Sequence, residues 1–226
     1  MLNLFRKKNP SPKEINIDKL IYEIELGEIL LIDTRNKSLY EKNHIKTAIN
    51  IPDLEFESNT DKLPIDKLYP IVFYCKNPEC TISINSAKKA IKLGYKNVYI
   101  FKEGIDGWNK YHNIKSEIQS QKNALDEKIF KEFYKLNKSN ILLVDVSDKE
   151  DYNEGHLKNA ISFPFGKLPG NYLKLSREKN IIFYCRTSNK AHEAYLFLIE
   201  KKEFDKNKIY YLNTPVKFEN GKVKFG

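Results

Sequence analysis

Two of the three cysteines stand at matching places in a repeated sequence. Cys75 ends the run IVFYC and Cys185 ends the run IIFYC, at an offset of 110 residues. Each apolar run predicts a buried strand, and each cysteine is followed by a polar turn and a helical pattern. A helix N-terminus carries partial positive charge, which stabilises a thiolate and lowers the pKa of the cysteine. We therefore predict that both cysteines are nucleophiles.

The turn after each cysteine would also bind an anion, because its backbone N–H groups point into the loop. A thiolate beside such a cradle suits attack on thiosulfate, a persulfide donor, or an oxyanion such as phosphate or arsenate. The alternative is an inert cysteine packed at the end of a strand. Two cysteines in matched settings favour the chemical interpretation.

The repeat extends well upstream of the cysteines. LLIDTRNKSLYEKNHIKTAINIP, from Leu30, matches LLVDVSDKEDYNEGHLKNAISFP, from Leu142, at an offset of 112 residues. A repeat of this length is a domain, so we expect two domains, residues 1–118 and 119–226. The polar stretch 113–122 is the predicted linker between them.

Each copy alternates apolar runs with helical patterns. This alternation predicts an α/β fold, in which each domain has a mainly parallel central sheet with helices on both faces. GIDGW, from Gly104, is expected to begin the closing helix of the first copy, whereas the second copy has no such residues, so its closing helix should be missing or replaced. Strands are predicted at 29–33, 71–75, 97–101, 141–145, 181–185 and 208–212, the last clear strand, and helices at 15–26, 83–93, 126–136 and 191–200.

The bulk composition excludes several classes of protein. The net charge is +9, but the lysines are spread along the chain, which favours a solvated surface; the charge permits a nucleic-acid partner but does not argue for one. Three cysteines are too few for a disulfide framework or a four-ligand zinc site, so we expect no metal, no cofactor and a reducing compartment. No apolar run approaches the roughly 18 residues of a membrane span, and we expect a soluble, cytoplasmic protein.

Taken together, these patterns resemble those of tandem rhodanese-domain proteins. The resemblance runs from about Ile15 to Leu212 and rests on LIDTR, YEKNHIKTAINIP, LGYKNVYIFKEGIDGW and FYCRTSNKA. It implies two rhodanese-like domains and a sulfurtransferase activity. In that family the cysteine takes a sulfane sulfur from a small anionic donor as a persulfide, then passes it to a thiol, cyanide or protein acceptor.

The second copy matches the family loop better. The resemblance makes Cys185 the catalytic residue, and Ser188 stands where the family usually has glycine, so the loop should be strained or differently shaped. Lys190 replaces the usual arginine and would bind an anion as a point charge. The predicted substrate-binding residues are Arg186, Thr187, Ser188, Asn189 and Lys190.

The first copy departs further from the family. Its loop, CKNPECTIS, is two residues longer and carries Lys76, a predicted anion-binding residue, together with Glu79, which opposes anion binding. We expect Cys75 to be its nucleophile. Cys80 is a candidate resolving thiol that attacks a persulfide or sulfenate on Cys75, or it occupies the centre of the loop itself, or it is passive.

Three other functions stay open beside the sulfurtransferase. A non-catalytic or relay module would bind a partner or a sulfur carrier through the first copy. A redox protein would use Cys75 and Cys80. A phosphatase or arsenate reductase fits less well, because neither Thr81 nor Ile82 can clamp an oxyanion as arginine does.

Two further pairs of residues match between the copies and could be catalytic, but we expect a structural role for both. Asp33 and Asp145 follow the same strand in each copy and should organise the loops beside the cysteine. His44 and His156 should each hydrogen-bond loop backbone, because a loop-stabilised thiolate needs no general base.

Overall fold

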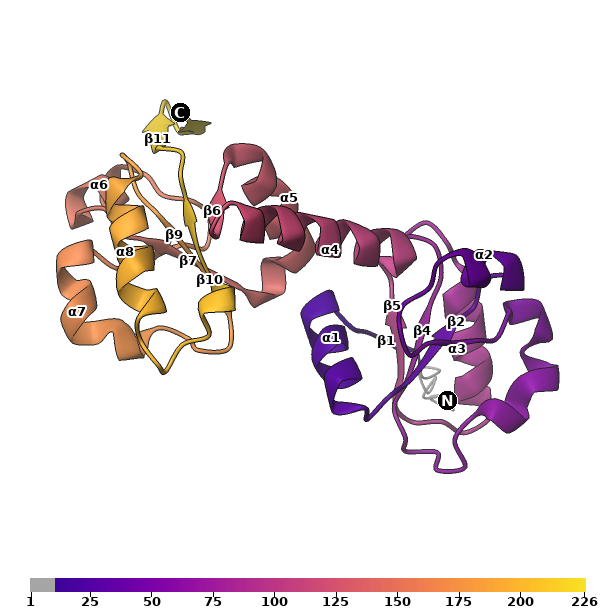
Figure 1. Cartoon of the computed structure of the whole chain (residues 1–226). Helices are drawn as coiled ribbons and strands as arrows, with labels where there is room; N and C mark the ends of the chain where they lie inside the picture. Colours follow the sequence, from indigo (N-terminus) through magenta and orange to yellow (C-terminus); the bar gives the residue numbers. More distant parts are fainter. Residues whose placement is uncertain (1–10) are drawn as a thin grey trace, which may run out of the picture. The chain divides into compact units, whose positions relative to one another are not determined.

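The computed structural model describes residues 11–226, which form two compact units (Figure 1). The first unit ends at Lys110 and the second begins at Tyr111. The predicted boundary between residues 118 and 119 thus falls inside the second unit.

The first unit is built on a sheet of five parallel strands. The strands lie side by side in the order β1-β5-β4-β2-β3, so β4 lies at the centre. The strands are β1 (Lys13–Glu14), β2 (Leu30–Asp33), β3 (Ile49–Asn50), β4 (Ile71–Tyr74) and β5 (Val98–Phe101).

Helices cover both faces of this sheet, with α1 on one side and α3 on the other (Figure 1). Asn16 caps α1 by accepting the Lys19 N–H, and Gly27 ends it in the left-handed conformation at φ 70°. The helices are α1 (Ile17–Leu26), α2 (Lys37–Lys42) and α3 (Ile82–Lys92), with 3-10 turns at Asp53–Glu55 and Glu57–Lys62.

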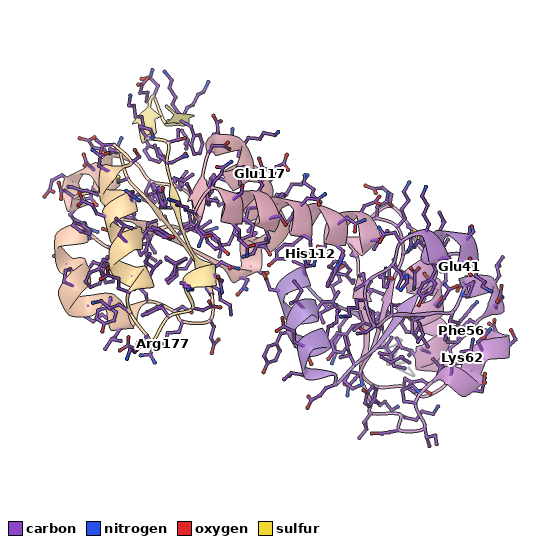
Figure 2. The ribbon with its side chains drawn as sticks, viewed as in Figure 1. Glu41, Phe56, Lys62, His112, Glu117 and Arg177 are labelled. Carbon is purple, nitrogen blue, oxygen red and sulfur yellow. A yellow bond between two sulfur atoms is a disulfide. The ribbon has the colours of Figure 1, made fainter. Side chains whose placement is uncertain are left out.

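One hydrophobic core of the first unit lies between the sheet and α3. Phe73 of β4 packs there with Phe56, which Figure 2 labels, and with Ala87 and Ala90 of α3. The small alanines let the helix approach the sheet closely, which fixes the start of α3 relative to the end of β4.

The second unit repeats the same sheet with the order β6-β10-β9-β7-β8, again with all strands parallel. In Figure 1, α5 lies on one side of it and α8 on the other. Its strands and helices are β6 (Ala124–Leu125), α5 (Glu127–Asn137), β7 (Ile141–Asp145), α6 (Lys149–Glu154), β8 (Ile161–Ser162), α7 (Leu168–Asn171), β9 (Asn180–Tyr184), α8 (Asn189–Ile199) and β10 (Ile209–Leu212), with 3-10 turns at Lys138–Asn140, Phe165–Lys167, Tyr172–Lys174 and Lys206–Lys208.

The predicted linker 113–122 is wrong for most of its length, because helix α4 (Gly104–Ser120) continues through it. Tyr111, Ile114 and Ile118 recur at helical spacing and are buried in the second unit. Burial of that apolar stripe outweighs the polar character of the residues between them.

The second unit ends in an antiparallel hairpin, β11 (Val216–Glu219) and β12 (Lys222–Phe225). Asn220 and Gly221 turn it with φ of 52° and 73°, the positive values that a tight two-residue hairpin turn requires. The closing helix is therefore replaced, as predicted, but β10 is not the last strand.

Within residues 11–226, no helix combines the length and the apolar composition that crossing a membrane requires. The same residues contain no cluster of three or more histidines, cysteines or carboxylates arranged to hold a metal ion.

Candidate active site

Both cysteines lie at the carboxyl end of the central strand of their sheet. Cys75 follows β4 and is 3% exposed, and Cys185 follows β9 and is 2% exposed. A helix begins after each loop, α3 in the first unit and α8 in the second. Ligands of open α/β sheets bind outside the carboxyl ends of the strands, so both loops lie where a substrate is expected.

The loop of the second unit is short, and its backbone donors face no acceptor. Cys185 is a free thiol, and α8 begins at Asn189. Within the described residues, no acceptor lies within hydrogen-bonding distance of the backbone N–H groups of residues 187–191. Five consecutive free donors at a helix N-terminus form the kind of cradle that binds an anion.

Ser188 has φ 66° and ψ −26°, a left-handed conformation that favours glycine. The prediction of strain at this position is confirmed. The conformation turns the chain sharply enough for α8 to start four residues after Cys185, and the Ser188 side chain makes no capping hydrogen bond.

One of the predicted binding residues lies beside the thiol, and a second lies at the start of the helix that follows the loop. Thr187 Oγ1 is 4.0 Å from Cys185 Sγ. Lys190 lies in the first turn of α8, where its Nζ contacts Asp148 Oδ2 at 2.8 Å. This hydrogen bond raises the pKa of Lys190.

Arg186 is held by other groups. Its Nη2 donates to Asp151 O at 2.6 Å and approaches Glu154 at 3.5 Å. Its guanidinium carbon lies 5.1 Å from the centre of the Phe218 ring, which belongs to the hairpin. Arg186 therefore joins α6 to the hairpin, and its binding of a substrate stays a prediction.

A tyrosine before each cysteine fixes the neighbouring loop, a role that the sequence analysis missed. The Tyr184 hydroxyl accepts the Leu157 N–H at 3.0 Å, and the Tyr74 hydroxyl accepts the Ile45 N–H at 3.1 Å. Burial raises the pKa of both tyrosines, and the carboxylates of Asp145 and Asp33 add to the rise. The sequence Phe-Tyr-Cys occurs in both copies and could have pointed to this role of the tyrosine.

The first unit differs most at its cysteine. Cys75 and Cys80 form a disulfide, with their Cα atoms 6.3 Å apart. A disulfide sulfur is not a thiolate, so the expected nucleophile Cys75 is blocked in this state. The pairing agrees with the alternative in which Cys80 acts on Cys75, because the four loop residues between them bring the second sulfur to the first.

The loop of the first unit is longer, as predicted. The buried residues Ser83, Ser86 and Ala90 of α3 match Ala191, Ala194 and Leu198 of α8 at an offset of 108, against 110 for the cysteines. The two extra residues allow a turn in which the Cys80 N–H donates to Asn77 O at 3.1 Å. The side chains of Lys76 and Glu79 are exposed on this loop.

The backbone of each cysteine is fixed by the element that follows the last parallel strand. The Ile105 N–H donates to Cys75 O at 3.0 Å, at the start of α4. In the second unit the Val216 N–H donates to Cys185 O at 3.1 Å, at the start of the hairpin. A helix and a hairpin thus supply the same hydrogen bond.

The matched aspartates hold the chain that follows their strands, whereas the prediction that the histidines bond loop backbone is wrong, because their partners lie in helices α2 and α6. Asp33 forms an ion pair with Arg35 at 2.6 Å, and Asp145 accepts the Ser147 N–H at 2.9 Å. The Nδ1 atoms of His44 and His156 lie 2.9 and 3.0 Å from the carbonyl oxygens of the tyrosines four residues earlier.

Comparison with known families gives two matches along the chain. The family model described as a rhodanese-like domain matches residues 16–111 and residues 130–214. Each match contains one cysteine loop.

Individual relatives match about one domain each. An uncharacterized protein of Buchnera aphidicola (subsp. Schizaphis graminum) is 34% identical over 108 residues, 47% of this chain and 69% of its own. Thiosulfate sulfurtransferase GlpE of Coxiella burnetii is 27% identical over 89 residues, 39% of this chain and 79% of its own.

Two solved structures are also similar to this chain. The BH2092 protein of Bacillus halodurans is 31% identical, with a TM-score of 0.41, and the match covers 44% of this chain and 73% of that one. Thiosulfate sulfurtransferase from Pseudomonas aeruginosa is 17% identical with a TM-score of 0.40, and the match covers 89% of this chain and 43% of that one.

Proposed function

The chain belongs to the rhodanese-like domain family, and from this premise we propose that its second unit is a thiosulfate sulfurtransferase with Cys185 as the catalytic residue. The observation that carries the proposal is a free thiol at the base of a loop whose backbone donors, residues 187–191, have no acceptor among the described residues. Thiosulfate sulfurtransferases among the relatives support the choice of donor.

The reaction has two displacement steps. The Cys185 thiolate attacks the outer sulfur of thiosulfate, the sulfur–sulfur bond breaks, and sulfite leaves with the bonding electrons. A thiolate, cyanide or protein cysteine then attacks the outer sulfur of the Cys185 persulfide and regenerates the thiolate.

The loop contributes by placing charge where the reaction needs it. The free N–H groups and Lys190 bind the anionic donor, and the same donors stabilise the thiolate and the persulfide anion. Lys190 offers a point charge without the bidentate geometry of arginine, so the donor is held mainly by the backbone.

A variant with a single cysteine tests the proposal. In Cys75→Ser/Cys80→Ser, incubation with thiosulfate should add one sulfur, about 32 Da, to Cys185, and cyanide should remove it. The control is the same variant with Cys185→Ser, in which no adduct forms. A folded Cys75→Ser/Cys80→Ser protein that takes up no sulfur would contradict the proposal and favour a non-catalytic module that binds a partner.

A further inference from the structure

We infer that the Cys75–Cys80 pair of the first unit reduces a sulfane sulfur to sulfide, with the disulfide as the second product. This reaction is distinct from transfer to an external acceptor through Cys185 and does not depend on it. The inference rests on the loop that holds the pair, on the different burial of the two cysteines, and on the balance of the reaction.

The loop brings the two thiols together without help from any other segment. Both cysteines lie in the stretch between β4 and α3, and the turn closed by the Cys80 N–H and Asn77 O reverses the chain between them. Pro78 sits inside the turn and restricts its backbone. Because the closed ring is short, the second thiol is present at high effective concentration whenever Cys75 carries a leaving group.

The backbone on the Cys75 side of the ring is held firmly. Cys75 O accepts the Ile105 N–H and Lys76 O accepts the Asp106 N–H, both at 3.0 Å. Gly104 lies so close that a Cβ there would meet the oxygens of both residues at 2.5 Å. The cysteine at the end of β4 therefore keeps its place while the rest of the loop can respond to the reaction.

The Cys80 side of the ring faces solvent. Cys80 is half-buried, whereas Cys75 is 3% exposed, and the side chains of Pro78, Glu79 and Thr81 around Cys80 are exposed. Thiol–disulfide exchange depends on which sulfur an attacking thiolate can reach. An external dithiol reductant therefore attacks Cys80 Sγ, and Cys75 leaves as the thiolate.

The reaction balances with thiosulfate as the donor. The Cys75 thiolate attacks its outer sulfur, and sulfite leaves, which gives a persulfide on Cys75. The Cys80 thiol then attacks Cys75 Sγ and forms the disulfide, while its proton passes to the outer sulfur, which leaves as hydrosulfide. The sulfane sulfur is reduced, the two thiols are oxidised, and a dithiol reductant returns the pair to its starting state.

The second unit cannot perform this step alone. Cys185 is the third of three cysteines in the chain, and its loop holds no second thiol. A persulfide on Cys185 can pass its sulfur only to an external acceptor. The extra residues of the first loop thus convert a persulfide carrier into a centre that releases its sulfur as sulfide.

A single-turnover experiment on the full chain tests the inference. Cys185→Ser, reduced and freed of reductant without oxygen, is treated with thiosulfate. We expect close to one sulfide per chain and a protein that has lost two hydrogens and gained no sulfur. Restoring dithiothreitol, the probe reductant, should allow further sulfide release, which a purely structural disulfide would not support.

The matched control removes only the resolving thiol. Cys80→Ser/Cys185→Ser should stop at an adduct of one sulfur, about 32 Da, with a sulfide yield at least roughly tenfold lower. Equal sulfide from both proteins, or a stable adduct in Cys185→Ser, would overturn the inference, as would the absence of both sulfide and oxidation. The sulfurtransferase proposal is tested on Cys185 alone, so the two failures are distinguishable.

Discussion

The two units share one sheet order and one position for cysteine, yet they surround that cysteine differently. In the first unit Cys75 is joined to Cys80, and helix α4 begins against its carbonyl group. In the second unit Cys185 is free, and a hairpin supplies the same hydrogen bond. The parallel sheet sets where the sulfur lies, whereas the loop after it decides what the sulfur can do.

The comparison extends to the polar residues under the loops. Asp33 and Asp145 occupy the same place, but a buried arginine accompanies the first alone, and Ser147 stands at the position of Arg35. The Ser147 hydroxyl instead accepts a hydrogen bond from the backbone N–H of Arg186 at 3.3 Å. Each unit thus supports its loop through a different set of polar contacts on the same frame.

The largest difference in stability between the two units is expected when the aspartate of each unit is replaced by asparagine. Asp33→Asn leaves the Arg35 guanidinium, 7% exposed, without a counter-ion, and should destabilise the first unit by about 3 kcal/mol. Asp145→Asn keeps an amide oxygen for the Ser147 N–H and should cost the second unit about 1 kcal/mol or less. Hydrogen exchange of the amides in β4 and β9 measures each unit separately.

Equal losses in the two variants would contradict this prediction, because they would mean that the ion pair adds nothing to the hydrogen bonds. Asp33→Asn combined with Arg35→Met serves as the control. Removing the buried cation together with its partner should recover much of the loss.

A smaller effect is expected at Gly104, where α4 meets the cysteine loop. Gly104 has φ 62°, and a Cβ would lie 2.5 Å from Cys75 O and Lys76 O. Gly104→Ala should therefore destabilise the first unit by about 2 kcal/mol or more. The measurement is again exchange in β4.

Gly94→Ala is the matched control for that substitution. Gly94 has φ 95° but no atom within 4 Å of a Cβ, so only the backbone conformation is strained and the loss should be about 1 kcal/mol. A loss at Gly104 no greater than at Gly94 would show that the close approach to the cysteine loop is easily relieved.

The repeat predicted most of the fold because periodic apolar runs are decided locally. The predicted strands at 71–75 and 141–145 became β4 and β7 within one residue at each end, and the helix at 83–93 became α3. Apart from Asp145 at the end of β7, each of these two strand runs is apolar, as burial on both faces of a parallel sheet requires. The order in which the strands pair was not predicted, because periodicity carries no information about which strands are neighbours.

The errors lie where tertiary contacts override composition. Residues 113–122 are polar on average, but Ile114 and Ile118 bury one face and keep the helix intact. The hairpin is an exception, because Asn220-Gly221 is a local turn signal that the sequence analysis passed over; its Phe218 then packs against Gly155 and Arg186. The Cys75–Cys80 bond depends on the shape of a turn that spacing alone left undecided.

The smallest expected effect is a gain in stability at Ser188. Its φ of 66° strains a residue with a Cβ, and its side chain makes no capping bond, so Ser188→Gly loses nothing in the folded state. The second unit should gain about 0.5–1 kcal/mol, less the added freedom of glycine in the unfolded chain. Slower hydrogen exchange of the amides in β9 would measure this gain.

Ser188→Ala keeps the Cβ and should leave the exchange rates unchanged. If the alanine variant stabilises the unit as much as glycine does, the strain does not lie in the backbone, and the serine in this loop carries no cost relative to the family's glycine.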